Sequence, residues 1–203
     1  MEEQKSSQRS ESGQLPQSQK DAPSAAGSLG LSGALSRRIT LLWSVLAVAL
    51  LVLLDQLTKT AAAGALRQKP PIVLLSGVLE LRYLENRGAA FGMFQNGQLF
   101  FSAVAIVAAI LIFLFLYRLP RTRRYLPLRI CLLLVAAGAL GNLLDRVTLH
   151  YVRDFIYFSL INFPIFNVAD MYVTVATALL VVLLLFYYNR DDDFAFLQRK
   201  SRK

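Results

Sequence analysis

The stretch that decides the fold is Gly138-Ala-Leu-Gly-Asn-Leu-Leu-Asp-Arg146, near the end of a long apolar run. Two further motifs follow it, Val152-Arg-Asp-Phe155 and then Phe163-Pro-Ile-Phe-Asn-Val-Ala-Asp170, at the start of another apolar run. Three aspartates, two asparagines and two arginines of these motifs therefore lie at the ends of otherwise apolar segments. Ionisable groups at membrane depth are costly and usually face a protein interior or an aqueous cavity. This stretch therefore indicates a working site.

The composition is that of an integral membrane protein with one polytopic domain. Of 203 residues, 55% are hydrophobic and only 17% are charged, and the mean hydropathy is +0.47. The net charge of +9 would suit a nucleic-acid partner, but the arginines cluster beside apolar runs, which argues against nucleic acid. With one cysteine, Cys131, and one histidine, His150, the chain has no disulfide of its own and no zinc or His-rich metal site.

Four apolar runs are long enough to cross the roughly 30 Å hydrocarbon layer. The first starts at Ile39 and continues through Asp55-Gln-Leu-Thr-Lys59, where the aspartate and the lysine share a helical face and can form an ion pair. The other three cover about 99–117, 130–149 and 168–188. We expect an all-α membrane protein with four transmembrane helices.

The runs divide the chain into three parts. Residues 1–36 are rich in Ser, Gln and Gly, and they predict a disordered polar tail, because such a segment buries too little apolar surface to offset its ordering entropy. Residues 37–190 form the four-helix membrane domain, and residues 191–203 form a charged cytoplasmic C-terminal tail.

Residues 67–98 differ from the rest of the domain. Pro70-Pro71 is followed by Ile72–Leu84, which has β-branched and alternating character, and then by Glu85-Asn-Arg-Gly-Ala-Ala-Phe-Gly92. This pattern predicts a small extramembrane sheet or hairpin, closed by a glycine-bearing turn, between the first and second transmembrane helices.

Two of the helices each carry a polar stripe. On the third, Gly138, Asn142 and Asp145 share a face, with Arg146 beside them. The fourth has its own set at the same spacing: Asn167, Asp170, Thr174 and Thr177. The two stripes are expected to face each other, with glycine allowing a close approach and asparagine hydrogen-bonding across helices.

Arginine and lysine bias predicts the orientation in the membrane. The N-terminal segment, the 118–129 loop and the 190–203 segment hold five Lys or Arg each. Basic loops stay in the cytoplasm, so both termini are predicted to be cytoplasmic, with the polar motifs near the extracytoplasmic face.

Asp154 and Asp170 are the best candidates for a catalytic carboxyl pair. Two carboxyl groups held a few ångströms apart do not both ionise easily, so their pKa values split. One can then act as general base toward water while the other donates a proton to a scissile carbonyl oxygen. This is peptide hydrolysis without a metal, a cofactor or a covalent intermediate.

Structural roles remain open for the same residues. Asn167 and Asp170 fit the N-cap and N3 positions of a helix. Asp145 could form a structural ion pair with Arg146, and Asp154 could pair with Arg153. Asp55 and Lys59 could anchor a helix end at the membrane interface.

Five motifs in unbroken order resemble those of the bacterial lipoprotein signal peptidase, or signal peptidase II. They are Asp55-Gln-Leu-Thr-Lys59, Asn86-Arg-Gly-Ala-Ala-Phe-Gly92, Gly138-Ala-Leu-Gly-Asn-Leu-Leu-Asp-Arg146, Val152-Arg-Asp-Phe155 and Phe166-Asn-Val-Ala-Asp170. Together they cover roughly residues 39–188.

The resemblance implies an aspartic endopeptidase of the bacterial cytoplasmic membrane. Such an enzyme removes the signal peptide of a prolipoprotein just before a cysteine that already carries diacylglycerol, and it is the target of globomycin. The catalytic pair falls on Asp154 and Asp170. Supporting positions for substrate binding and for the carboxyl pair are Asp55, Lys59, Asn86, Asn142, Asp145, Arg146 and Asn167. The predicted sheet matches an extracytoplasmic cradle for the substrate, and the long polar tail departs from the family pattern.

The expected partners are diacylglyceryl-prolipoproteins and membrane lipid, and we expect the protein to be a monomer. Two other functions compete with this one. An ion-coupled transporter would use the aspartates as a relay, but four spans without an internal repeat argue against it. A Ser-Lys peptidase would use Lys59, but no serine is convincingly placed opposite it.

Overall fold

The computed structural model describes residues 25–88, 97–190 and 193–197. Arg37–Lys203 form one compact unit. The helices are α1 (Ala25–Leu66), α2 (Gln98–Arg118), α3 (Leu126–Leu149) and α4 (Val168–Val182), which a π-helical segment, η4 (Leu183–Tyr187), extends. The strands are β1 (Ile72–Leu75), β2 (Leu79–Asn86) and β3 (Val152–Phe158). Three short 3-10 helices complete the elements: η2 (Arg123–Tyr125), η3 (Ser159–Ile161) and η5 (Ala195–Leu197).

Four helical segments are long and apolar enough to cross a membrane, which confirms the predicted four spans. They are Arg37–Leu66, Gln98–Arg118, Arg123–Leu149 and Val168–Tyr187. Large apolar side chains such as Leu99 and Phe186 are exposed along them. In a soluble domain this much exposed apolar surface would be a liability, whereas in a bilayer it is the surface that contacts lipid.

The start of α1 differs from the prediction. The helix begins at Ala25, so residues 25–36, which the sequence places in a disordered tail, are helical. Extending an existing helix requires no new nucleation, and this segment contains alanine and leucine, both good helix formers. The rest of the predicted tail, residues 1–24, lies outside the described residues, as do residues 191–192 and 198–203 of the C-terminal segment.

The strands form one antiparallel sheet in the order β1-β2-β3. The predicted hairpin is β1 and β2, and its turn contains Gly77 at φ 69°, a conformation that glycine adopts without a Cβ penalty. The third strand was not predicted and comes from the segment between α3 and α4, pairing Asp154 with Leu84 of β2. The sheet therefore combines strands from two parts of the chain, the connection between α1 and α2 and the connection between α3 and α4. The predicted turn after Glu85 is described only as far as Gly88.

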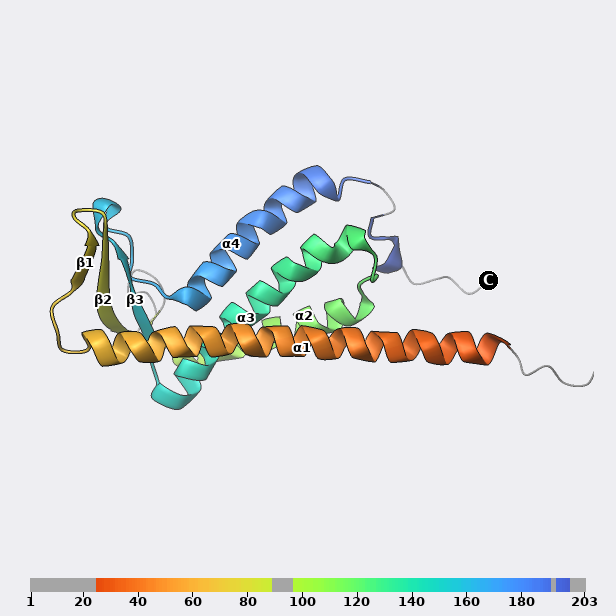
Figure 1. The fold of residues 1–203 in the computed structure, drawn as a ribbon, viewed down its shortest axis with the longest axis horizontal. Helices are drawn as coiled ribbons and strands as arrows, with labels where there is room; N and C mark the ends of the chain where they lie inside the picture. Colours follow the sequence, from red (N-terminus) through yellow and green to blue (C-terminus); the bar gives the residue numbers. More distant parts are fainter. Residues whose placement is uncertain (1–24, 89–96, 191–192, 198–203) are drawn as a thin grey trace, which may run out of the picture. The chain divides into compact units, whose positions relative to one another are not determined.

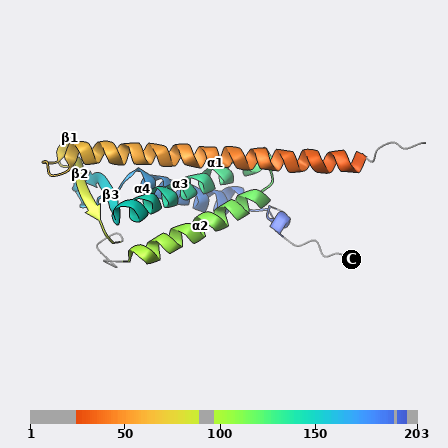
Figure 2. The same cartoon turned by 90° about the horizontal axis from the view of Figure 1, so that it is seen from below.

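Helices α3 and α4 pack closely through small residues. A Cβ added to Gly138 would clash with the carbonyl oxygen of Ala169 and with Val173, and Ala137 and Ala169 have no exposed surface. The predicted close approach at Gly138 is therefore confirmed. The buried part of the polar stripe on α4 is shorter than predicted, since Thr174 and Thr177 are both exposed. Because α3 ends and α4 begins beside the sheet, their polar ends meet there (Figure 1, Figure 2).

At the other end of the helices, part of the C-terminal segment is folded against η2. The guanidinium of Arg124 binds Asp193, with Nη2 2.7 Å from Oδ2, and Tyr125 donates to the Asp193 carbonyl oxygen at 2.7 Å. The Arg124 guanidinium holds the pKa of the Asp193 carboxyl below its usual range. Phe194 and Phe196 pack on the apolar cluster that contains Tyr125. These contacts attach residues 193–197 to the segment between α2 and α3.

Candidate active site

A cavity of about 1230 Å³ opens where the sheet meets α3 and α4. Its polar wall includes Asn86 from β2, Asn142 and Arg146 from α3, Asp154 from β3 and Asp170 from α4. The connection from β3 to α4 and one side of α4 supply apolar surface, including Phe163, Pro164, Ile165, Phe166, Met171 and Val175. The site therefore places two carboxyl groups beside a large, mainly apolar space.

Asp154 is held by two amide groups. Its Oδ1 accepts a hydrogen bond from Asn167 Nδ2 at 2.6 Å, and its Oδ2 accepts one from Asn86 Nδ2 at 2.8 Å. The residue is only 1% exposed. Burial, with the neighbouring Asp170 carboxyl as the second cause, raises the pKa of Asp154 to about 7. A carboxyl group with this pKa can exchange a proton near neutral pH.

Asp170 is fixed by the start of α4. Asn167 is the N-cap, its Oδ1 accepting from the Asp170 N–H at 3.0 Å, while Asp170 Oδ2 accepts from the Asn167 N–H at 3.1 Å. This reciprocal capping box confirms the structural role considered for the pair. The other oxygen, Oδ1, accepts from Asn142 Nδ2 at 2.7 Å. Capping and lining the cavity are thus compatible, because the two carboxyl oxygens have different partners.

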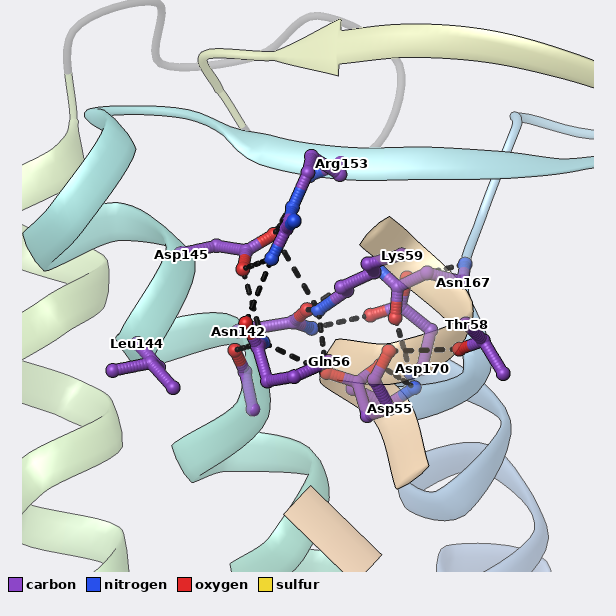
Figure 3. Close-up of polar contacts among 12 residues, drawn as sticks. Asp55, Gln56, Thr58, Lys59, Asn142, Leu144, Asp145, Arg153, Asn167 and Asp170 are labelled. Carbon is purple, nitrogen blue, oxygen red and sulfur yellow. Dashed lines mark hydrogen bonds and ion pairs between the residues drawn. The ribbon is translucent and has the colours of Figure 1, made fainter. Parts of the chain in front are cut away.

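A buried network connects the two carboxyl groups to α1, and Figure 3 shows the part of it that contains Asp170, Asn142 and Lys59. Asn142 Oδ1 accepts from both Asn167 Nδ2 at 3.1 Å and Lys59 Nζ at 2.8 Å. Lys59 pairs with Asp55 at 2.8 Å, and Asp55 Oδ1 accepts the backbone N–H of Ala169 at 2.9 Å. The predicted ion pair on α1 therefore forms, but both of its side chains are completely buried in the helix packing, not placed at an interfacial surface.

The predicted partner of Asp145 is wrong. Its carboxylate pairs with Arg153 at 2.7 Å and lies 3.7 Å from Lys59 Nζ. Adjacent residues of a helix point in directions about 100° apart, so Arg146 is directed elsewhere. The Arg146 guanidinium lies 5.4 Å from the centre of the Phe101 ring and lines the cavity.

The alternative pairing of Asp154 with Arg153 is also wrong. Successive residues of a strand face opposite sides of the sheet, so the two side chains diverge. Arg153 and its partner Gln56 were not predicted as part of this cluster. The alternation of side chains along β3 indicates that Arg153 points away from Asp154. No local pattern, however, identifies an acceptor that is 97 residues away in sequence. Among the residues that the structure describes, no group of three or more His, Cys, Asp or Glu side chains could hold a metal ion.

Four membrane-crossing helices and a buried carboxyl pair on a large cavity define a multi-pass membrane enzyme, and solved structures agree. One bacterial membrane enzyme, determined by the in meso method at 2.3 Å resolution, has a TM-score of 0.63 and 30% sequence identity, covering 79% of this chain and 94% of that one. A second bacterial membrane enzyme, determined by the same method at 1.9 Å resolution, has a TM-score of 0.62 and 31% sequence identity. That match covers 71% of this chain and 93% of the other.

The sequence comparisons give the family. The sequence model of signal peptidase (SPase) II matches residues 47–186. The lipoprotein signal peptidase of Clostridium tetani is 40% identical over 139 residues, 67% of this chain and 88% of that protein. The lipoprotein signal peptidase of Symbiobacterium thermophilum is 42% identical over 139 residues, which are 68% of this chain and 90% of that protein. The chain belongs to the signal peptidase II family and is a peptidase.

Proposed function

We propose that this protein removes signal peptides from diacylglyceryl-modified prolipoproteins, cleaving just before the lipidated cysteine. Asp154 and Asp170 would form the catalytic pair. The observation that supports this best is their placement on one cavity, each hydrogen-bonded by an asparagine from another element. Membership of the signal peptidase II family supports prolipoproteins as the substrate class.

The chemistry requires one proton on the pair. The ionised carboxylate takes a proton from water, whose oxygen attacks the scissile carbonyl carbon. The protonated carboxyl donates its proton to the carbonyl oxygen, which avoids a full charge on that oxygen in the apolar cavity. As the tetrahedral intermediate collapses and the C–N bond breaks, the carboxyl that took the proton from water gives it to the leaving amine. The other carboxylate takes back a proton from a hydroxyl of the intermediate, which becomes the carbonyl of the new C-terminus, so the pair again holds one proton. Asn167 links the two carboxyl groups, because its Nδ2 donates to Asp154 and its backbone N–H donates to Asp170.

Charged and polar side chains surround the carboxyl pair. Arg146 lines the same cavity and supplies a positive charge beside both carboxyl groups. Lys59 lies behind Asn142 and neutralises buried negative charge. Asn86 keeps Asp154 oriented from the β2 side. The apolar wall supplies contact area for the acyl chains of the substrate.

The arginine and lysine bias supports an orientation of the enzyme in the membrane. We place the enzyme in the bacterial cytoplasmic membrane as a monomer, with both termini in the cytoplasm and the cavity near the extracytoplasmic face. In the same orientation the five arginines of the 118–129 loop lie at the cytoplasmic surface. A lipid-anchored precursor then diffuses in the bilayer and reaches the cavity from the membrane side.

The decisive experiment offers the purified enzyme one precursor peptide with and without diacylglycerol on its cysteine. We expect the lipidated peptide to be cleaved just before the cysteine and the unlipidated peptide to be cleaved far more slowly, because each buried CH₂ contributes about 0.8 kcal/mol to association. Cleavage is followed by mass spectrometry in mixed micelles. Equal rates for the two peptides would point to a general membrane peptidase instead.

The pKa of Asp154 predicts a pH dependence. Since that pKa is raised to about 7, the single shared proton is lost as the pH rises through this value, and activity falls with it. Above it, kcat/KM should decline about tenfold per pH unit. Asn86 donates to the ionised carboxylate, so Asn86→Ala favours the protonated form and should move this decline to higher pH. A shift to lower pH in that variant would contradict the assignment.

A further inference from the structure

Arg153 uses nearly every donor it has to attach β3 to the helices. Its backbone N–H and its Nε donate to Asp145 Oδ2 at 3.0 and 3.1 Å, and its Nη2 donates to Asp145 Oδ1 at 2.7 Å. On α1, Nη2 also donates to Gln56 Oε1 at 2.7 Å, and Nη1 donates to Thr60 Oγ1 at 3.1 Å. One side chain of a strand is thus bonded to two helices (Figure 3).

The acceptors are themselves held in place. Gln56 Nε2 donates to Asp145 Oδ1 at 3.0 Å and to the Gly141 carbonyl oxygen at 3.1 Å. Asp145 is completely buried, and the Arg153 side chain is only 12% exposed. A guanidinium presents its donors in a rigid plane, so a bidentate contact of this kind fixes orientation as well as distance.

The residue that follows Arg153 in the strand is Asp154. Asp170 is positioned by the first turn of α4, whereas Asp154 is carried by an extramembrane sheet. The separation of the two carboxyl groups therefore depends on how the sheet is attached to the helices. Arg153 makes that attachment at the adjacent residue, on the opposite face of the strand, so it leaves the cavity unobstructed.

We infer that Arg153 is a positioning residue for the peptidase reaction, which sets the place of Asp154 relative to Asp170 by fixing β3 to α1 and α3. The inference rests on the proposed function of the two aspartates. Arg153 touches neither the substrate cavity nor the carboxyl pair, so its effect is geometric. A displacement of about 1 Å at a reacting group can lower a rate roughly 10²-fold.

The test compares Arg153→Gln and Arg153→Lys with Arg67→Gln. Arg67 also binds a carboxylate at 2.8 Å, that of Glu85 on β2, but its side chain is 56% exposed, which makes it the matched control. For folded Arg153→Gln we expect kcat to fall about 10²-fold with KM nearly unchanged. Arg153→Lys keeps the charge without the planar fork, so it should restore only part of kcat. Arg67→Gln should match the wild type.

A second readout separates positioning from stability. If the two carboxyl groups move apart, their electrostatic coupling weakens, and the pH at which activity declines should shift in both Arg153 variants. Lys59 and Arg146 also act on the pair, and both are kept unchanged. A purely structural role would lower the yield or the Tm but leave kcat and the pH profile of the folded fraction unaltered.

The outcomes distinguish this inference from the proposed function. An inactive Asp154→Asn variant beside a fully active Arg153→Gln variant would overturn the inference and leave the catalytic pair standing. An active Asp154→Asn variant would overturn both. If neither Arg153 variant folds, Arg153 is a stability residue and the inference is wrong. Confirmation requires a lower kcat, a constant KM and a shifted pH profile in folded protein.

Discussion

The Asp154→Asn and Asp170→Asn variants are expected to insert and fold, yet to cleave lipidated precursor several orders of magnitude more slowly than the wild type. Asparagine keeps the size of the side chain and one of its two acceptor oxygens but cannot carry the shared proton. Neither carboxyl group can act alone, so either change should remove nearly all turnover. Single-turnover cleavage of a diacylglyceryl precursor peptide, followed by mass spectrometry, gives the rate.

The same variants separate catalysis from capping at Asp170. Its Oδ2 accepts the N–H of Asn167, and an asparagine oxygen can accept the same bond, so the helix start should lose no more than about 1 kcal/mol. Asp193→Asn is the matched control, because Asp193 is also a buried carboxylate but binds Arg124 at the opposite end of the helices. It should lower the Tm without changing kcat. Near-normal turnover by a folded Asp154→Asn or Asp170→Asn variant would refute the proposed pair.

Removing the charge of Lys59 should cause the largest loss of stability. Lys59→Met keeps the aliphatic stem but removes the cation that lies 2.8 Å from Asp55 and 3.7 Å from Asp145. The carboxylates of Asp55 and Asp145 are both completely buried. Breaking a buried ion pair in this way costs about 3–5 kcal/mol. Thermal unfolding in detergent, followed by helical circular dichroism, measures the effect.

Arg67→Met provides the comparison for Lys59→Met. Its ion pair with Glu85 has the same 2.8 Å separation, but the Arg67 side chain is 56% exposed. Exposed pairs contribute about 0–1 kcal/mol, so this variant should unfold close to the wild-type temperature. Equal destabilisation by the two substitutions would show that the burial of the Lys59 pair does not govern its contribution.

Local patterns predicted much of the structure. The apolar runs gave the four spans, glycine spacing gave the close approach of α3 and α4 at Gly138, and the Asn167–Asp170 spacing gave a capping box. Each of these depends on residues within one or two turns of each other, or on composition alone. Such features can be predicted from the sequence because helix geometry fixes which neighbours meet.

The features that were missed depend on contacts between distant parts of the chain. Strand β3 pairs with β2 although α2 and α3 lie between them in the sequence. Arg153 donates to Gln56, which is 97 residues away in the sequence. Adjacency in sequence suggests an Asp145–Arg146 ion pair, but the helix directs the two side chains apart. The early start of α1 reflects helix extension, which a composition-based prediction of disorder does not include.

The carboxyl group that caps the last membrane helix is also half of the proposed catalytic pair, and this links the onset of activity to the order of synthesis. Asp170 and the Ala169 N–H that binds Asp55 both belong to the first turn of α4. A nascent chain that has inserted only α1, α2 and α3 therefore has Asp154 without its partner. With the proposed pair, the peptidase is complete only when α4 has entered the bilayer, and an unfinished chain is expected not to cleave precursor.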